Sequence, residues 1–141
     1  MKLSARNILK GKVTKVVHGA VNAEVDLMLD GGDKVAAIIT NQSCAALGLK
    51  EGMVACAVVK ASEVIIGKGL EHAKISARNL LKGKVAKATP GAVNCEIVLK
   101  LAGGAEVVAI ITKESCNALG LKEGEEAQAV IKASNVILAV E

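Results

Sequence analysis

Hydroxyl and basic side chains recur in this sequence at spacings that could build a site for a small anion. They stand in three short segments of the first half and again in three matching segments of the second half. The two parallel sets are Ser4, Arg6, Asn7, Thr40, Ser43, Lys60 and Ser62, and Ser76, Arg78, Asn79, Thr112, Ser115, Lys132 and Ser134. Arginine and lysine donate charge-assisted hydrogen bonds to oxyanions, and hydroxyl groups add neutral ones. Because every member can donate, the sets predict binding of a small tetrahedral dianion.

The same residues also have ordinary structural uses. Serine and asparagine are common where strands and turns begin, Thr40 and Ser43 could cap a helix, and Arg6 and Lys60 could be solvated charges. Spacing alone leaves both interpretations open. Recurrence within one chain favours a binding site only slightly, because duplicated segments also keep structural residues.

Histidine and carboxylate residues offer little for acid–base catalysis. His18 aligns with Pro90, and His72 stands between the two halves, so no histidine is repeated. Glu24 and Glu96 are the only repeated strand carboxylates, and we expect both to face solvent. A single acid without a partner is a weak catalytic pattern. We therefore predict a protein that is not an enzyme and has no catalytic residue.

The four cysteines are expected to be reduced thiols. Cys44 and Cys116 are equivalent in the two halves, whereas Cys56 and Cys95 have no cysteine counterpart, so the halves share no disulfide pattern. No C-x-x-C pair predicts a zinc site. A thiol at a helix start can be a nucleophile, but no repeated histidine accompanies Cys44 or Cys116 as a base.

An internal repeat positions both sets of donors. Residues 3–69 align without a gap on residues 75–141, and most aligned positions are identical. A long unit present only twice indicates two homologous domains rather than a solenoid, which needs three or more copies. We predict a first domain at 1–67, a glycine-containing linker at 68–73 and a second domain at 74–141.

The first copy predicts five short strands and one short helix. Residues 22–29 alternate apolar and polar side chains, the period of a half-buried strand, and residues 30–33 form a hairpin turn. Thr40 or Ser43 can cap a helix that Gly48 ends. The other strands are expected at 7–17, 34–39, 54–60 and 63–66. This order predicts an all-β protein with short helices, built as two tandem five-stranded OB-fold (Greek-key) barrels, and an SH3-like barrel stays open as the alternative.

Composition limits the classes of protein further. The chain is 52% hydrophobic and 23% charged, carries a net charge of +4 and has no Phe, Trp or Tyr. A domain of roughly 70 residues is marginal without the area that aromatic rings bury, so we expect an oligomer. Missing aromatic rings also disfavour a nucleic-acid binder, which stacks bases on them. No long apolar run or secretory signal is visible, and we expect a cytoplasmic protein without a membrane span.

Five ordered motifs, each present twice, resemble the molybdenum-pterin-binding protein (Mop) domain of the TOBE/OB-fold type. They are SARN-x-L-x-G-x-V, GAVN-x-E, AIIT-x-x-S, LGLKEG and VxKASxV, and two such domains in tandem resemble the molbindins. The resemblance implies trimers that bind molybdate or tungstate in pockets at domain and subunit interfaces. The site residues that it implies are Ser4, Arg6, Thr40, Ser43, Lys60, Ala61 and Ser62, and Ser76, Arg78, Thr112, Ser115, Lys132, Ala133 and Ser134.

A second kind of oxyanion site is also implied by the resemblance, near a symmetry axis. Its candidate residues are Gly19, Ala20, Val21 and Asn22, and Gly91, Ala92, Val93 and Asn94. The first copy has His18 where the second has Pro90, so we expect these two environments to differ.

The resemblance implies cytoplasmic binding, storage or buffering of molybdate, with no cofactor and no bare metal ion. Two alternatives from other classes stay open. One is a module that senses an oxyanion and then docks on a partner protein, and the other is an OB-type nucleic-acid binder. The sequence does not rank molybdate, tungstate and sulfate, because all three are tetrahedral dianions.

Overall fold

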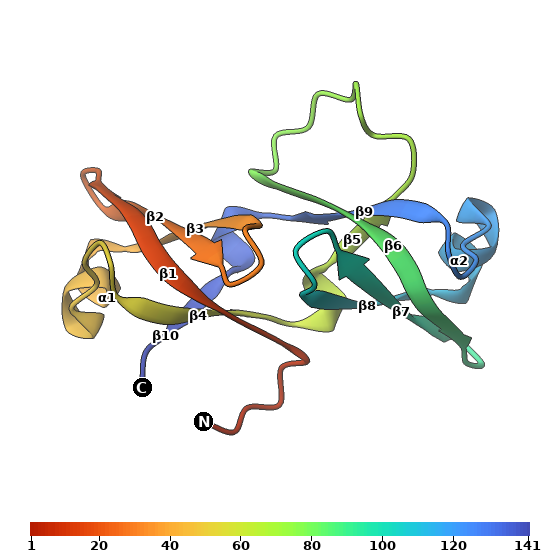
Figure 1. Ribbon diagram of the computed structural model, residues 1–141, viewed down its shortest axis with the longest axis horizontal. Helices are drawn as coiled ribbons and strands as arrows, with labels where there is room; N and C mark the ends of the chain where they lie inside the picture. Colours follow the sequence, from red (N-terminus) through yellow and green to blue (C-terminus); the bar gives the residue numbers. More distant parts are fainter.

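A computed structural model describes residues 1–141 as two curled five-stranded sheets that lie side by side along the long axis (Figure 1). The first half of the chain forms β1 (Asn7–His18), β2 (Asn22–Leu29), β3 (Lys34–Thr40), α1 (Asn41–Leu47), β4 (Val54–Val59), the 3-10 turn η1 (Ala61–Glu63) and β5 (Ile65–Gly67). The second half forms β6 (Asn79–Pro90), β7 (Asn94–Leu101), β8 (Glu106–Thr112), α2 (Lys113–Leu119), β9 (Glu126–Ile131), the 3-10 turn η2 (Ala133–Asn135) and β10 (Ile137–Ala139). The predicted all-β class with short helices is confirmed.

The strands form because their apolar residues alternate. In β2, Val25 and Leu27 are fully buried while Glu24 and Asp26 are only half-buried, as the sequence pattern predicts. The hairpin between β2 and β3 lies at the predicted turn. Buried aliphatic side chains of both halves belong to one core cluster, so the two sheets are packed together.

Each helix begins and ends at the predicted residues. The Thr40 hydroxyl accepts a hydrogen bond from the Ser43 N–H at 3.0 Å and so caps α1, and Thr112 caps α2 through Ser115 in the same way. Gly48 ends α1 in the left-handed conformation, with φ of 64°, which glycine adopts without steric cost.

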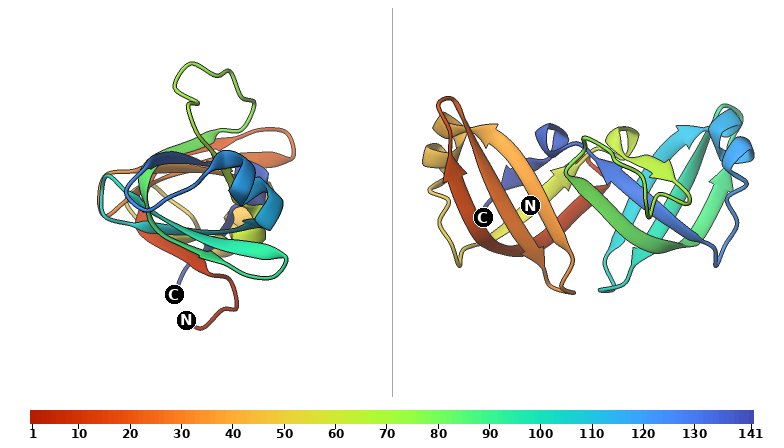
Figure 2. Two further views of the ribbon diagram at one scale, coloured as in Figure 1. Left: turned by 90° about the vertical axis from the view of Figure 1, so that its right-hand side faces the viewer. Right: turned by 90° about the horizontal axis from the view of Figure 1, so that it is seen from above.

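The last short strand of each half joins the sheet of the other half. The first sheet has the order β10-β4-β1-β2-β3, and the second has the order β5-β9-β6-β7-β8. Ile137 pairs with Val58, and Ile65 pairs with Val130. The turns η1 and η2 lie where the chain crosses between the sheets, near the middle of the molecule in Figure 2. The division at 1–67 and 74–141 stays a prediction about the sequence, because each sheet takes strands from both segments.

Two buried asparagines fasten the halves to each other. Asn7, only 2% exposed, donates from Nδ2 to the Val108 carbonyl at 2.8 Å and accepts from the Val108 N–H at 2.7 Å. Asn79, 3% exposed, makes the same pair of bonds to the backbone of Ala36, at 2.8 and 2.7 Å. Each side-chain amide thus satisfies one N–H and one C=O on the facing strand of the other half. The Asn of each SARN motif is therefore a structural residue.

Two hairpin turns also meet where the sheets touch. The backbones of Gly31 and Gly103 approach so closely that a Cβ atom on either residue would overlap the other backbone. Asp33 Oδ2 accepts a hydrogen bond from the Gly103 N–H at 3.2 Å. Glycine is required here for close approach, and its φ is ordinary at both positions.

Replacing Asn79 with alanine should lower the free energy of unfolding by about 2–4 kcal/mol, because the buried N–H and C=O of Ala36 would both lose their partner. Urea denaturation followed by circular dichroism measures this change. Asn22→Ala is the matched control, since Asn22 is exposed and its side chain makes no hydrogen bond. Equal stability of the two variants would show that the cross-half bonds contribute nothing.

Candidate functional site

Strand pairing brings the SARN and KAS motifs of one half together. Asn7 at the start of β1 pairs with Val59 at the end of β4, so the residues before Asn7 lie beside the residues after Val59. In the second half, Asn79 pairs with Ile131 in the same register. Antiparallel pairing at these two positions is therefore what places each arginine beside a lysine.

A cavity of about 480 Å³ lies at this junction in the first half. Five of the seven predicted residues of the first set line it: Ser4, Arg6, Lys60, Ala61 and Ser62. Its apolar lining comes from Leu3 and Val58 of the first half and from Ile110 of β8 and Ile137 of β10 in the second half. The cavity thus combines basic and hydroxyl donors of one half with aliphatic side chains of both halves.

Thr40 and Ser43 line a different cavity, of about 420 Å³, together with Ser134 of the second half. The Thr40 hydroxyl donates to Ser43 Oγ at 2.9 Å, and the Ser43 hydroxyl donates to no protein group. Strand exchange brings Ser134 to Thr40 and Ser43, because η2 packs against β3. In the same way, η1 packs against β8. The helix-start hydroxyls of one half therefore face the KAS motif of the other half, whereas the sequence sets grouped them within one half.

Arg6 and Arg78 each pair with a glutamate of the opposite half. Arg6 donates from Nη1 and Nη2 to the two carboxylate oxygens of Glu96, at 3.1 and 3.2 Å. Arg78 forms an equivalent ion pair with Glu24. The hydrogen bond from the arginine lowers the pKa of each glutamate below its ordinary value, and the carboxylate in turn raises the pKa of each arginine. Half of each arginine side chain stays exposed.

The sequence interpretation missed these carboxylates, which were expected to face solvent alone. Glu24 and Glu96 point instead at the arginine of the SARN motif, across the boundary between the halves. Their recurrence in GAVN-x-E beside a recurring arginine was the available signal. This recurrence does not show that each arginine pairs with the glutamate of the other half, because an internal repeat does not show which copy a strand faces.

The turns at 19–22 and 91–94, the second candidate site, connect β1 to β2 and β6 to β7. Each is closed by a hydrogen bond from the N–H of its glycine to the carbonyl of its asparagine, at 2.7 Å. Val21 and Val93 are 70% and 73% exposed. His18 Nδ1 lies 2.9 Å from Asn41 Oδ1, and the second half has Pro90 and Lys113 at these positions. The two turns therefore differ in their neighbours, as the His18 and Pro90 exchange predicts.

The cysteines provide no second site. All four are free thiols, and Cys44 and Cys95 are buried. Burial raises the pKa of Cys116, and contact with Cys95 adds to the shift, so this thiol is less ionised than an ordinary cysteine. No group of three or more His, Cys, Asp and Glu side chains is placed to hold a metal ion.

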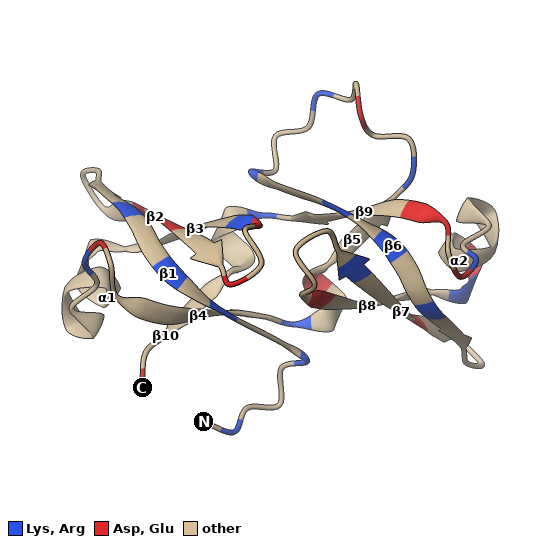
Figure 3. Ribbon diagram, viewed as in Figure 1, with Lys and Arg blue, Asp and Glu red and all other residues tan.

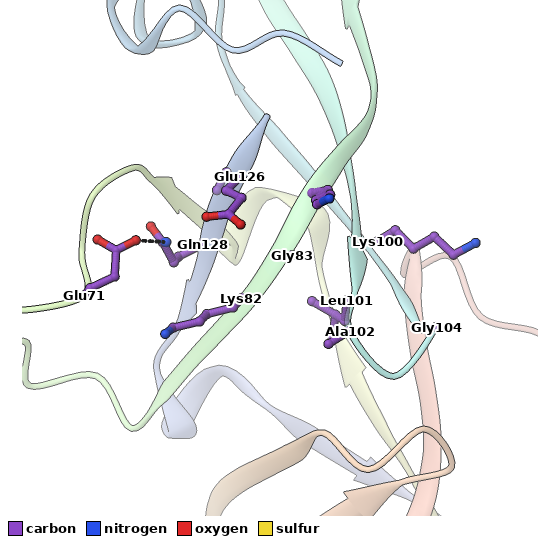
Figure 4. Close-up of a pocket in the computed structure, with 11 residues that line it drawn as sticks. Glu71, Lys82, Gly83, Lys100, Leu101, Ala102, Gly104, Glu126 and Gln128 are labelled. Carbon is purple, nitrogen blue, oxygen red and sulfur yellow. Dashed lines mark hydrogen bonds between the residues drawn. The ribbon is translucent and has the colours of Figure 1, made fainter. Parts of the chain in front are cut away.

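A cavity of about 500 Å³ lies away from every predicted donor, in the second half (Figure 4). Lys82 and Glu126 border it, and Gln128 stands where the first half has Cys56. The Gln128 side chain donates to Glu71 at 3.2 Å and accepts from the Leu70 N–H at 3.4 Å, which ties the segment between β5 and β6 to the sheet. Gln128 is thus explained as a structural residue.

Charged residues are distributed over both halves, as Figure 3 shows, and no element gathers most of the basic side chains. None of the helices is long and apolar enough to cross a membrane.

Comparison with known proteins relates the chain to the TOBE domain and to molybdenum-pterin-binding proteins. A model of the TOBE domain matches residues 3–66 and 75–138. MopA of Rhodobacter capsulatus, a molybdenum-pterin-binding protein, is 46% identical over 140 residues, which are 99% of this chain and 53% of MopA. Molybdenum-pterin-binding protein 3 of Clostridium pasteurianum is 53% identical over 66 residues, 47% of this chain and 97% of that protein. The chain spans about half the length of its longer curated relatives.

A solved structure matches the whole chain. The cytoplasmic molybdate-binding protein ModG, crystallised with molybdate bound, is 51% identical and superposes with a TM-score of 0.96 over 100% of both chains. This agreement extends to both sheets and therefore includes the exchanged strands.

The ion pairs predict a change of stability with pH. Replacing both Glu24 and Glu96 with glutamine should lower Tm at pH 7 by about 1–3 °C, a small effect because the pairs are partly exposed. A carboxyl whose pKa is lowered by folding stabilises the protein above its unfolded pKa of about 4.3 and loses this contribution as the pH falls through the lower folded value. The difference in Tm between the wild type and the variant should therefore shrink from about pH 5 to pH 3.

Thermal melts followed by circular dichroism measure this difference. Glu51→Gln is the control, because Glu51 is exposed and belongs to no ion pair. A difference in Tm that persists unchanged at pH 3 would exclude the ion pairs as its source.

Proposed function

The chain belongs to the TOBE-domain family, and on that premise we propose that it binds molybdate and tungstate in the cytoplasm and stores or buffers them. The observation that carries the proposal is the cavity at the junction of the SARN and KAS motifs, where Ser4, Arg6, Lys60 and Ser62 converge. Two cations and two hydroxyls in one cavity suit a tetrahedral dianion. The likeness to ModG and to MopA supports molybdate as that dianion.

The donors act by replacing the hydration shell of the anion. Arg6 presents a planar fork of N–H groups, Lys60 presents a compact charge, and the serines complete the coordination. Ala61 is 6% exposed and contributes no side chain that would fill the cavity. Ile110 and Ile137 add aliphatic surface to the lining, and a less polar surrounding strengthens charge-assisted bonds.

Each site takes parts from both halves. Thr40 and Ser43 share a cavity with Ser134, so the second site draws on Ser76, Arg78, Lys132, Ala133 and Ser134 with these two hydroxyls of the first half. The first site draws on Thr112 and Ser115 in the same manner, because β8 packs against η1. Two such sites form in every chain.

The glutamates regulate how available the arginines are. Glu96 accepts both hydrogen bonds from the fork of Arg6, and an incoming dianion competes with that carboxylate or displaces it. Release of the anion then restores the ion pair between Arg6 and Glu96. Reversible binding of this kind suits a buffer better than it suits a permanent cofactor site.

The turns at 19–22 and 91–94 are the second kind of oxyanion site in this proposal. Asn22 and Asn94 and the exposed turn backbone supply neutral donors. Lys113 lies beside the second turn in place of Asn41, so that turn carries more positive charge.

We assign no catalysis, nucleic-acid binding or membrane binding to the chain. The second candidate function is an oxyanion sensor that docks on a partner protein, favoured by the likeness to the molybdenum transport protein ModE of Azotobacter vinelandii. Capture of one partner only in the presence of molybdate would favour sensing. Binding of molybdate by the purified chain with no such partner would favour storage.

Arg6→Lys should weaken one class of molybdate site roughly ten- to hundredfold, the scale of a lost charge-assisted hydrogen bond. Lysine keeps the charge and can still pair with Glu96, so the fold should stay intact. Isothermal titration with molybdate measures the change, and Arg78→Lys is the matched variant for the other class. Unchanged affinity and stoichiometry in the double variant would remove both arginines from the sites.

The protein should sediment as a trimer of about 43 kDa, three times the chain mass of 14.4 kDa. Exposed aliphatic side chains supply the apolar area for such an interface, with Ile65 and Ile137 each 59% exposed. Because Ile137 also lines the Arg6 cavity, assembly and binding should be coupled. Sedimentation equilibrium that finds a monomer with molybdate bound would contradict the trimer.

A further inference from the structure

One position beside the two arginines differs in charge between the halves. Asp26 on β2 aligns with Val98 on β7, and each follows by two residues the glutamate that pairs with an arginine. Residues two apart on a strand share a face. Arg78 therefore meets the face of β2 that carries Glu24 and Asp26, whereas Arg6 meets a face that carries Glu96 and the buried, uncharged Val98.

The register fixes Asp26 close to the second SARN motif. Asp26 pairs across the sheet with Ala36, the residue whose backbone holds the side chain of Asn79, the neighbour of Arg78. Val98 pairs with Val108, which holds Asn7 in the same way. The two positions are therefore geometrically equivalent, and only the carboxylate distinguishes them.

Asp26 has no partner of its own that neutralises it. Its Oδ1 atom is buried and accepts no hydrogen bond. Lys15 pairs with Asp26 in the register of β1 and β2, but Lys87 takes the same place opposite Val98, so the lysines do not offset the difference. The pKa of Arg78 is raised first by its hydrogen bond with Glu24 and also by the charge of Asp26, while Arg6 receives no contribution from position 98.

We propose that Asp26 makes the Arg78 site the weaker of the two oxyanion sites in the chain, so that the halves bind molybdate with different affinities. The inference rests on the proposed function. A second carboxylate beside the arginine repels an incoming dianion and lowers the field that attracts it. The chain thereby covers a wider range of oxyanion concentration than two equal sites would.

Replacement of Asp26 with Val, the residue of the other half, tests this inference. In isothermal titration with sodium molybdate, Asp26→Val should tighten the weaker class of site by about 3- to 10-fold and leave the tighter class unchanged. Asp26→Asn removes the charge while it keeps the shape, and it should give the same result if charge is the cause. The reciprocal Val98→Asp should weaken the tighter class by a similar factor.

Glu51→Gln is the control for loss of a distant charge, and it should change neither affinity. Arg78→Lys in the Asp26→Val background should abolish the gain, which assigns it to that site. Unchanged affinities in both Asp26 variants, with molybdate bound by the wild type, would overturn the inference and leave the proposed function standing. Absence of binding of molybdate and tungstate by the wild type would overturn the proposed function and the inference with it.

Discussion

Exchange of the last short strand between the two halves is the constraint on which the rest of the structure depends. A five-stranded sheet of either half is incomplete without three residues of the other, and the crossing chain carries the KAS motif into the space between the sheets. Asn7 and Asn79 then fasten each first strand to the facing sheet through buried backbone groups. Neither half has an aromatic residue, so this shared burial replaces the area that large rings would supply.

The same exchange explains why the cavities of the candidate site are lined by residues of both halves. Antiparallel pairing of Asn7 with Val59 places Arg6 beside Lys60, and packing of η2 on β3 brings Ser134 to Thr40 and Ser43. Both arginine–glutamate pairs cross the same boundary between the halves. In the function that we propose, an anion that draws Arg6 away from Glu96 acts on the contact between the halves as well as on its own pocket.

Much of the local structure could be predicted from the sequence, because local signals determine it. Alternation in β2, the threonine cap before α1 and Gly48 after it are each set by a few neighbouring residues, and the structure confirms all three. Local signals do not determine which of the two sheets each last short strand joins. Ile65 and Ile137 have equivalent sequences around them, so no pattern shows which sheet each strand joins. The grouping of Thr40 with Ser134, and of Arg6 with Glu96, could not be predicted for the same reason.

Differences between the two copies carry functional information that their identities do not. Identical residues at equivalent positions are needed twice to build the same turns, caps and strand contacts, and Asn7 and Asn79 show that a repeated polar residue can be purely structural. A residue that differs between the copies is not needed for the turns, caps and strand contacts that both copies share. Gln128 in place of Cys56 has a structural role, because its side chain binds Glu71 and so holds the segment between β5 and β6. Asp26 in place of Val98 has no such structural role, because its buried oxygen has no hydrogen-bond partner. Its charge instead acts on Arg78, the arginine of the second candidate site.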